Sequence, residues 1–190
     1  MAFKMSSNRF NSGCVTGRLL VLALLCLSFA ACTSNSKESR SESGGVKNLP
    51  TLPGFELKGP SGKLEKSSGW KEPYVVIHFW AAWCAPCIEE LPAFVRFVER
   101  SKGLTQVRFV AINLDPQLAD ATAVLPLDQI PSNLTYLLDP DKTVPEKLGS
   151  FQFPETYLAG SSRQVLKKWV GAQDWSQIDL NNLLQSLNNK

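Results

Sequence analysis

Residues 79–87 read Phe-Trp-Ala-Ala-Trp-Cys-Ala-Pro-Cys, so Cys84 and Cys87 are separated by two residues. The segment 73–80 that leads into this motif is almost entirely apolar, β-branched or aromatic, which predicts a strand buried on both faces. After the motif, apolar residues recur at helical spacing: Ile88, Leu91, Phe94, Val95 and Val98. The stretch therefore predicts a strand, a tight turn and a helix that begins near Cys84.

The two cysteines have the spacing and the setting of a reactive pair. Two intervening residues let the thiols meet across one helical turn, so a disulfide can close with little rearrangement. Unpaired N–H groups and the partial positive charge at a helix N-terminus favour the thiolate of Cys84, and a fall in its pKa from about 8.5 toward 7 corresponds to about 2 kcal/mol. Pro86 has no N–H to satisfy and suits a first turn. We expect Cys84 to be the more exposed nucleophile and Cys87 the more buried resolving thiol.

Two other roles for this pair have to be weighed, half of a zinc site and an inert structural disulfide. Tetrahedral zinc needs four ligands, whereas the chain after residue 32 offers two cysteines and one histidine, His78. A disulfide that closes so short a loop constrains the unfolded chain little. Redox exchange is the favoured interpretation, with no metal site and no cofactor beyond the Cys84–Cys87 disulfide itself.

The first 31 residues have the layout of a signal peptide. Three basic residues, Lys4, Arg9 and Arg18, accompany an apolar run from Leu19 to Ala31, and this segment contains no acid. Thirteen residues span about 20 Å as a helix, which is short of the roughly 30 Å hydrocarbon core of a bilayer. We predict that residues 1–31 are a signal peptide, and an uncleaved, extended signal anchor is the alternative.

The residues around Cys32 predict how the exported chain begins. The segment 28–32, Ser-Phe-Ala-Ala-Cys, resembles the lipobox of bacterial lipoproteins, in which the cysteine is lipidated and becomes the new N-terminus. Phe29 departs from that pattern, and ordinary cleavage after Ala30 is the alternative. Residues 32–48 are small, polar and charged, which predicts a flexible tether. Residues 49–190 then form the predicted folded domain, anchored through Cys32 and facing the periplasm or extracytoplasmic space.

Charge and cysteine content narrow the possible functions. The formal net charge is +3, but the residues after 31 carry 17 basic and 17 acidic side chains. Without a clustered basic excess there is no electrostatic case for nucleic-acid binding. If Cys14 and Cys26 leave with the signal and Cys32 carries lipid, only the motif cysteines remain free, in a compartment where disulfides persist.

The rest of the chain alternates strands and helices. Residues 55–66 alternate apolar and polar around a turn cluster, which predicts a β-hairpin. Further predicted elements are strands at 107–114, 134–138, 156–159 and 164–170, a short helix at 143–148, and a last helix at 176–187 that Ser176 could cap. Residues 117–131 stay ambiguous because Pro126 interrupts any helix that begins at Asp120. The order predicts an α/β fold, with a central mixed sheet covered by helices on both faces.

The motif at 79–87 resembles the signature of the thioredoxin superfamily. Pro92 matches the proline that kinks the family's helix, and residues 153–158, Phe-Pro-Glu-Thr-Tyr-Leu, resemble the segment that holds its cis-proline. The N-terminal hairpin and an inserted segment at about 116–139 resemble the extracytoplasmic TlpA/ResA-type branch, which includes reductants of cytochrome c maturation. The resemblance implies a thioredoxin-like fold over about 50–185. It also implies that Pro154 is cis beside the cysteines, with the backbone of Phe153 free to pair with a substrate; a trans proline ending a loop is the alternative.

Two ionisable residues near the motif have competing interpretations. Glu90 lies three residues after Cys87, where ResA-type proteins carry an active-site acid, and it could shuttle the proton of Cys87; a solvated helix position is the alternative. His78 stands where cytoplasmic thioredoxins place a buried acid. It is a possible proton relay, but a neutral, structural ring is favoured. Trp83 adjoins Cys84 and is expected to line the substrate surface with Pro86, whereas Trp80 is expected in the core.

These features together predict an exported thiol–disulfide oxidoreductase that reduces disulfides of exported proteins. Its partners would be those clients and a membrane thiol reductase or oxidase that recycles it. Branch resemblance favours the reducing direction, although the Ala-Pro dipeptide does not fix the reduction potential. A binding module that holds an exported client without turnover is the alternative function. A peroxide-reducing relative is disfavoured, because its threonine-containing cysteine context is absent.

Overall fold

The computed structural model describes residues 49–189, so the predicted signal peptide (1–31), the tether (32–48) and Cys32 lie outside the described residues. The described part contains seven strands: β1 (Glu56–Lys58), β2 (Leu64–Lys66), β3 (Tyr74–Trp80), β4 (Val107–Asn113), β5 (Leu134–Leu138), β6 (Glu155–Ala159) and β7 (Val165–Val170). Its helices are α1 (Ala85–Arg100), α2 (Leu118–Val124), α3 (Thr143–Leu148) and α4 (Leu180–Asn188), with 3-10 turns η1 (Ser67–Gly69) and η2 (Leu127–Gln129).

The strands form one mixed sheet in the order β2-β1-β5-β4-β3-β6-β7. The central strand β3 pairs in parallel with β4 and antiparallel with β6, and β4 continues in parallel to β5. The hairpin β1–β2 extends the sheet beyond β5, while β7 pairs antiparallel with β6 at the other side. This arrangement confirms the predicted fold class and puts the motif cysteines just after the central strand.

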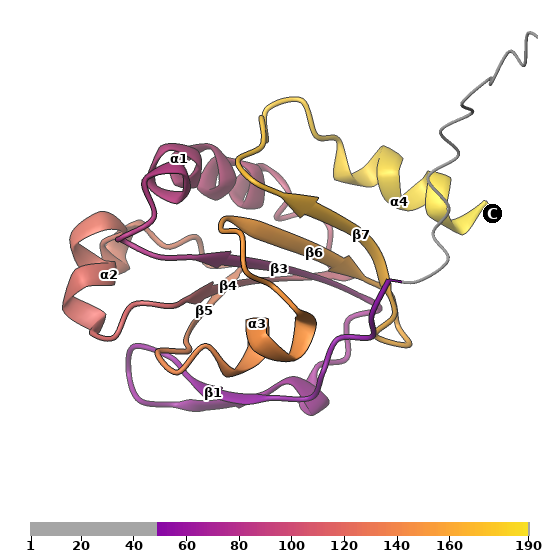
Figure 1. The fold of residues 1–190 in the computed structure, drawn as a ribbon. Coiled ribbons are helices and arrows are strands. Elements are labelled where there is room, and N and C mark those ends of the chain that lie inside the picture. The colour runs from indigo at the N-terminus through magenta and orange to yellow at the C-terminus, as the bar shows by residue number, and fades with distance from the viewer. Residues whose placement is uncertain (1–48, 190) are drawn as a thin grey trace, which may run out of the picture. The chain divides into compact units, whose positions relative to one another are not determined.

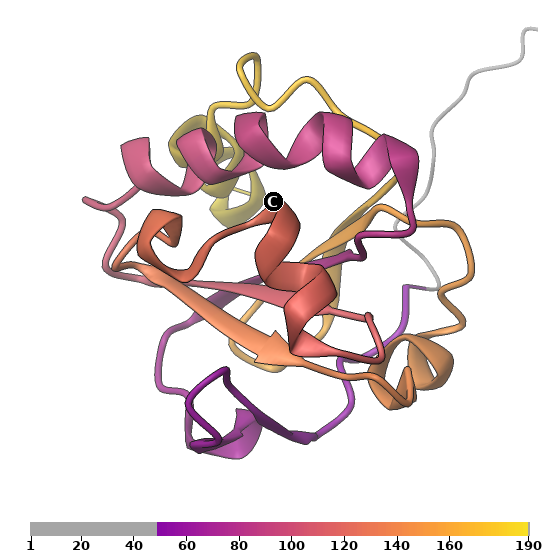
Figure 2. The ribbon, with the colours of Figure 1, turned by 90° about the vertical axis from the view of Figure 1, so that its left-hand side faces the viewer.

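Helices cover both faces of the sheet. Because successive side chains of a strand point to opposite faces, His78 and Ile77 of β3 lie on different sides. The His78 side is covered by α1, whose Phe94 stacks on the imidazole at 4.1 Å between ring centroids. On the Ile77 side, Tyr157 of β6 meets Ser150, which follows α3. Figure 1 shows α1 and α4 on one side of the sheet and α3 on the other, and Figure 2 shows α1 along its length.

Two predictions about the helices need correction or completion. The last helix was expected from Ser176, but α4 begins at Leu180, because the Asp179 carboxylate accepts a hydrogen bond from the backbone N–H of Asn182 and forms the N-cap. The ambiguous segment before β5 divides at Pro126 into α2 and η2, as the missing N–H of proline requires. None of the helices within residues 49–189 has the length and apolar character needed to cross a bilayer.

Candidate active site

The cysteine pair sits at the N-terminal end of α1. Cys84 is the N-cap residue and Cys87 lies in the first turn, with Pro86 between them at a position that needs no donor. Their sulfur atoms form a disulfide at 2.09 Å, and the Cα atoms are 5.2 Å apart. Cys84 retains 6% exposure, whereas Cys87 is completely buried. The structure therefore gives the two sulfurs the unequal access that was expected, and only Cys84 lines an open cavity.

The turn that delivers Cys84 is held by Asp115, a residue that sequence reasoning missed. Both carboxylate oxygens of Asp115 accept from the backbone N–H of Ala82, at 3.0 and 2.9 Å. The Asn113 side chain in turn donates to Asp115 at 2.7 Å, and the Cys84 N–H donates to the carbonyl of Ala81. Asp115 lies two residues beyond the end of the parallel strand β4, and a polar residue at that carboxyl edge was the available signal.

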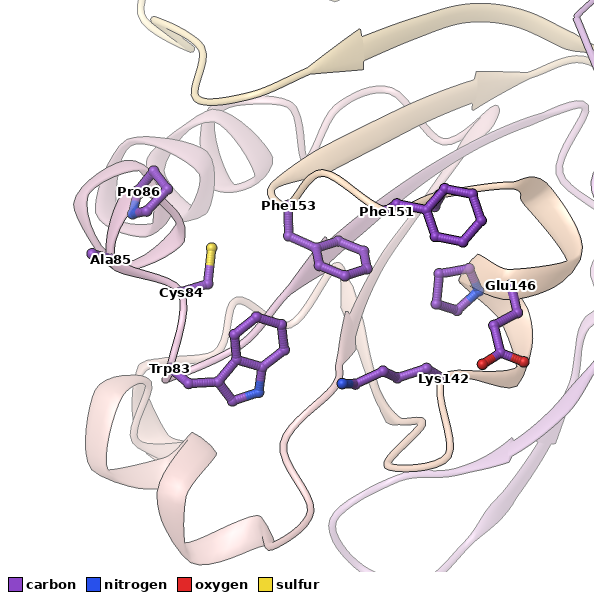
Figure 3. Close-up of a pocket in the computed structure, with 10 residues that line it drawn as sticks. Trp83, Cys84, Ala85, Pro86, Lys142, Glu146, Phe151 and Phe153 are labelled. Atoms are coloured by element: carbon purple, nitrogen blue, oxygen red, sulfur yellow. The ribbon is translucent and has the colours of Figure 1, made fainter.

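A cavity of about 520 Å³ opens beside Cys84. Figure 3 shows the Trp83 and Phe153 rings next to each other beside Cys84, and they meet edge to face at 6.1 Å between centroids. Phe151 lies farther out and is 77% exposed. Lys142 approaches the Trp83 ring, with its Nζ atom 4.9 Å from the centroid. Of the predicted site residues, Trp83, Cys84, Pro86 and Phe153 line this cavity; Lys142 and Phe151 were not predicted.

Pro154 is buried and the Phe153–Pro154 peptide bond is cis, as the resemblance implied. The residue that follows, Glu155, begins a buried polar network. Tyr157 donates its hydroxyl to Glu155 at 2.9 Å and also bonds Ser150 at 2.5 Å. Lys168 completes the network with an ion pair to Glu155 at 3.0 Å. The network brackets the segment 150–155, which contains both phenylalanines of the cavity.

Glu90 is not among the residues that line this cavity; it lies on the buried face of α1, the closed side of the site. It is 5% exposed, so the alternative of a solvated helix position is wrong. Its carboxylate accepts from the indole N–H of Trp175 and from the backbone N–H of Gln173 at 3.2 Å. Burial raises the pKa of Glu90 to about 7, against the effect of these two donors, which lower it. A carboxyl group one helical turn from Cys87 that titrates near neutrality is suited to proton transfer.

His78 is completely buried on the same side. Its Nδ1 atom lies 2.8 Å from the Thr156 hydroxyl, and its Nε2 atom has no hydrogen-bond partner among the described residues. Burial lowers the pKa of His78 to about 3, so the ring stays neutral near pH 7. Stacked on Phe94, the imidazole is suited to the structural role that the sequence favoured. Trp80 is fully buried and belongs to the core, as expected.

Comparison with known proteins identifies the family to which this constellation belongs. The model of the AhpC/TSA family matches residues 50–168. The chain belongs to the AhpC/TSA family. Two Bacillus subtilis proteins are similar to this chain. Thioredoxin-like protein YneN is 31% identical over 114 residues, 50% of this chain and 67% of the relative. Sporulation thiol-disulfide oxidoreductase A is 24% identical over 170 residues, 86% of this chain and 96% of the relative.

A solved structure agrees with the fold. A Chlorobium tepidum protein described as a thiol:disulfide interchange protein DsbE is 26% identical, with a TM-score of 0.61, and the match covers 75% of this chain and 99% of the other. The comparisons confirm the predicted ResA-type thioredoxin-like relationship and the predicted enzyme class, a thiol–disulfide oxidoreductase. The catalytic roles of the individual residues stay predictions, which the following sections develop.

Proposed function

We propose that the protein is an exported reductant of disulfides in other exported proteins, with Cys84 as the attacking sulfur. One observation carries the proposal: the Cys84–Cys87 pair lies at a helix N-terminus, and only Cys84 borders an open cavity. The helix N-terminus favours the thiolate of Cys84 in the reduced protein. The redox group is the protein's own dithiol, so the reaction needs no bound cofactor.

The proposed reaction is a two-step exchange. The Cys84 thiolate bonds to one client sulfur, the client disulfide breaks, and its second sulfur leaves as a thiolate. Cys87 then loses its proton and attacks Cys84, which releases the reduced client and closes the Cys84–Cys87 disulfide. We assign the proton of Cys87 to Glu90, because this buried residue follows Cys87 by one helical turn and its pKa of about 7 lets it change charge near neutrality. Two electrons pass to the client, and a membrane thiol reductase has to restore the dithiol.

Export and lipidation at Cys32 would place this reaction at the outer side of a membrane. The support is the signal-like segment 1–31 and the lipobox-like end at Cys32. Labelling cells with a fatty-acid analogue tests this part: wild type should take up the label, and a protein that carries Cys32→Ser should not. Cytochrome c maturation is one pathway that the family resemblance suggests for the clients.

Trapping of clients tests the proposed exchange. In cells, Cys87→Ser should accumulate mixed disulfides on Cys84, because the resolving attack is lost. The matched control is the double variant Cys84→Ser/Cys87→Ser, which should carry none at this site. Absence of adducts in Cys87→Ser, while the wild type reduces insulin normally, would overturn the assignment of roles. Equilibration of the purified protein with glutathione measures the reduction potential and therefore tests the reducing direction.

The same double variant separates catalysis from simple binding. A module that only holds an exported client does not need either sulfur, so the double variant would still support the cellular role. Loss of that role in the double variant, with the folded protein present at wild-type level, supports the exchange reaction.

A further inference from the structure

The cavity beside Cys84 is built mainly from aromatic side chains that the fold leaves uncovered. Trp83 is 53% exposed and Phe151 is 77% exposed, which makes them the two most exposed large apolar residues in the described part of the chain. Phe153 meets the Trp83 ring edge to face and lines the same cavity. Large apolar side chains gathered around a reactive atom are typical of an interaction site rather than of ordinary surface.

Buried polar contacts hold the segment that carries Phe151 and Phe153. The bond between Ser150 and the Tyr157 hydroxyl, and the Glu155–Tyr157 and Glu155–Lys168 contacts, hold both ends of the segment that carries Phe151 and Phe153. On the facing side, Lys142 adopts a left-handed backbone conformation with φ of 55° just before α3. The cavity is present with the Cys84–Cys87 disulfide closed and is held by contacts within the domain, and a preformed site lowers the ordering cost of binding.

The charges that line the cavity balance one another. Lys142 contributes one positive charge and Glu146 one negative charge, and the other lining side chains are uncharged. In Figure 3 the Lys142 amine points toward Trp83, whereas the Glu146 carboxylate lies on the far side of Lys142 from Cys84. Because the lining has no net charge, it gives no electrostatic preference for a strongly acidic or basic client. The aromatic side chains of the lining are therefore the feature that can distinguish one client side chain from another.

The chemistry of Cys84 determines what part of a client reaches the cavity. In a mixed disulfide, the Cα atom of the client cysteine lies within about 4.4–6.8 Å of the Cα atom of Cys84. The residues before and after that cysteine follow at about 3.8 Å per step along the client chain. A cavity that borders the Cys84 sulfur therefore receives a side chain adjacent to the client cysteine. The volume of about 520 Å³ is ample for one large side chain and its backbone.

We propose that this protein selects client disulfides in which a large apolar side chain flanks the attacked cysteine and enters the cavity of Trp83, Phe151 and Phe153. The proposal rests on the proposed disulfide-reducing function and adds a substrate class to it. A second apolar hollow, between α1 and α2 at Ile88 and Val124, contains neither cysteine and so is not the place where a residue next to the client disulfide binds.

Two disulfide peptides test the proposal with the reduced full chain. The peptides have equal length and one internal disulfide, and they differ only in a leucine or a serine beside the first cysteine. Formation of the Cys84–Cys87 disulfide is followed by acid quenching and mass spectrometry of the fragment that contains both cysteines. Each rate constant is divided by that for hydroxyethyl disulfide, which has no flanking residue. The leucine peptide is expected to react about tenfold faster than the serine peptide.

Variants decide whether the cavity causes this preference. Phe151→Ala, at a position that contributes little to the core, is expected to reduce the tenfold ratio to about threefold or less, and Phe153→Ala should do the same. The matched control is Leu127→Ala, which removes an exposed apolar residue away from the cavity and should keep the full ratio. A ratio near one in the wild type, or a full ratio in both phenylalanine variants, overturns the proposal. Failure of the proposed function looks different, because the reduced wild type would then react with neither peptide nor hydroxyethyl disulfide.

Discussion

The two sulfurs of one disulfide lie in opposite surroundings. Cys84 faces the open side, where the aromatic rings of Trp83 and Phe151 are largely exposed. Cys87 faces the closed side, where Trp175 is fully buried and covers the carboxylate of Glu90. Aromatic residues of the same kind therefore serve two purposes: on the closed side they create a dry environment that changes pKa values, and on the open side they offer area to a client.

The largest expected effect is on stability: truncation of a buried aromatic residue on the closed side should cost much more unfolding free energy than truncation of an exposed one on the open side. On the closed side, Trp175 packs against Phe94 and Phe97, with ring centroids 5.2 and 4.9 Å away. Trp175→Ala should lower the free energy of unfolding by about 3–5 kcal/mol, because it leaves a cavity and removes a donor to Glu90. Phe151→Ala on the open side should change it by less than about 0.5 kcal/mol. Urea denaturation of both variants measures this contrast, and similar losses in the two would remove the distinction between the sides.

The closed side should also impose two opposite pH dependences on stability. Burial lowers the pKa of His78 from 6.5 to about 3, so the folded state loses stability as the pH falls from 6.5 toward 3. Burial raises the pKa of Glu90 from 4.5 to about 7, so the folded state loses stability as the pH rises from 4.5 through 7. Between about pH 4.5 and 6.5 these two slopes, each about 1.4 kcal/mol per pH unit, should nearly cancel.

Replacing Glu90 or His78 should reveal the pH dependence of the unfolding free energy that the other residue causes. When the pH falls from 6.5 to 4.5, Glu90→Gln should lose about 2 kcal/mol of unfolding free energy relative to the wild type, because only the His78 slope remains. His78→Phe keeps a ring against Phe94 and should gain about 2 kcal/mol over the same change. Urea titrations of the oxidised proteins at several pH values measure both differences. Parallel pH profiles for the three proteins would show that neither group titrates as its burial requires.

The strand, turn and helix that carry the two cysteines could be predicted from the sequence to a greater extent than the contacts around them. Strand β3, the turn and α1 follow from local patterns, because hydrophobic periodicity within 73–98 determines them. The contacts that complete the site join residues far apart in the chain: Ala82 and Asp115 are 33 residues apart, and Glu90 and Trp175 are 85 apart. Periodicity indicates which face of an element is buried, but it does not indicate which distant side chain covers it.

The start of α4 shows the same limit within a shorter range. Both Ser176 and Asp179 are capping residues by type, and both precede a run with helical periodicity. The choice between them depends on the local path of the chain: residues 175–177 form a turn and a bend, closed by the Gln177 N–H donating to the Asp174 carbonyl, and so lie outside the helix. The Ser176 side chain bonds to Asp174 instead, and so it is not available to the helix.

The smallest expected effect tests this N-cap. Asp179→Ala should destabilise the protein by about 1 kcal/mol, because the N–H of Asn182 loses its acceptor and the helix loses a negative charge at its N-terminus. Asp179→Ser, which retains a side-chain acceptor, should recover most of that loss, and Ser176→Ala should change stability by less than about 0.5 kcal/mol. Urea denaturation at one pH is sufficient for all three variants.

The helix α4 lies on the same face of the sheet as the closed side (Figure 1). The Asp179→Ala variant should therefore keep the preference for the leucine peptide over the serine peptide. A change in that preference would mean that the two sides are coupled through α1.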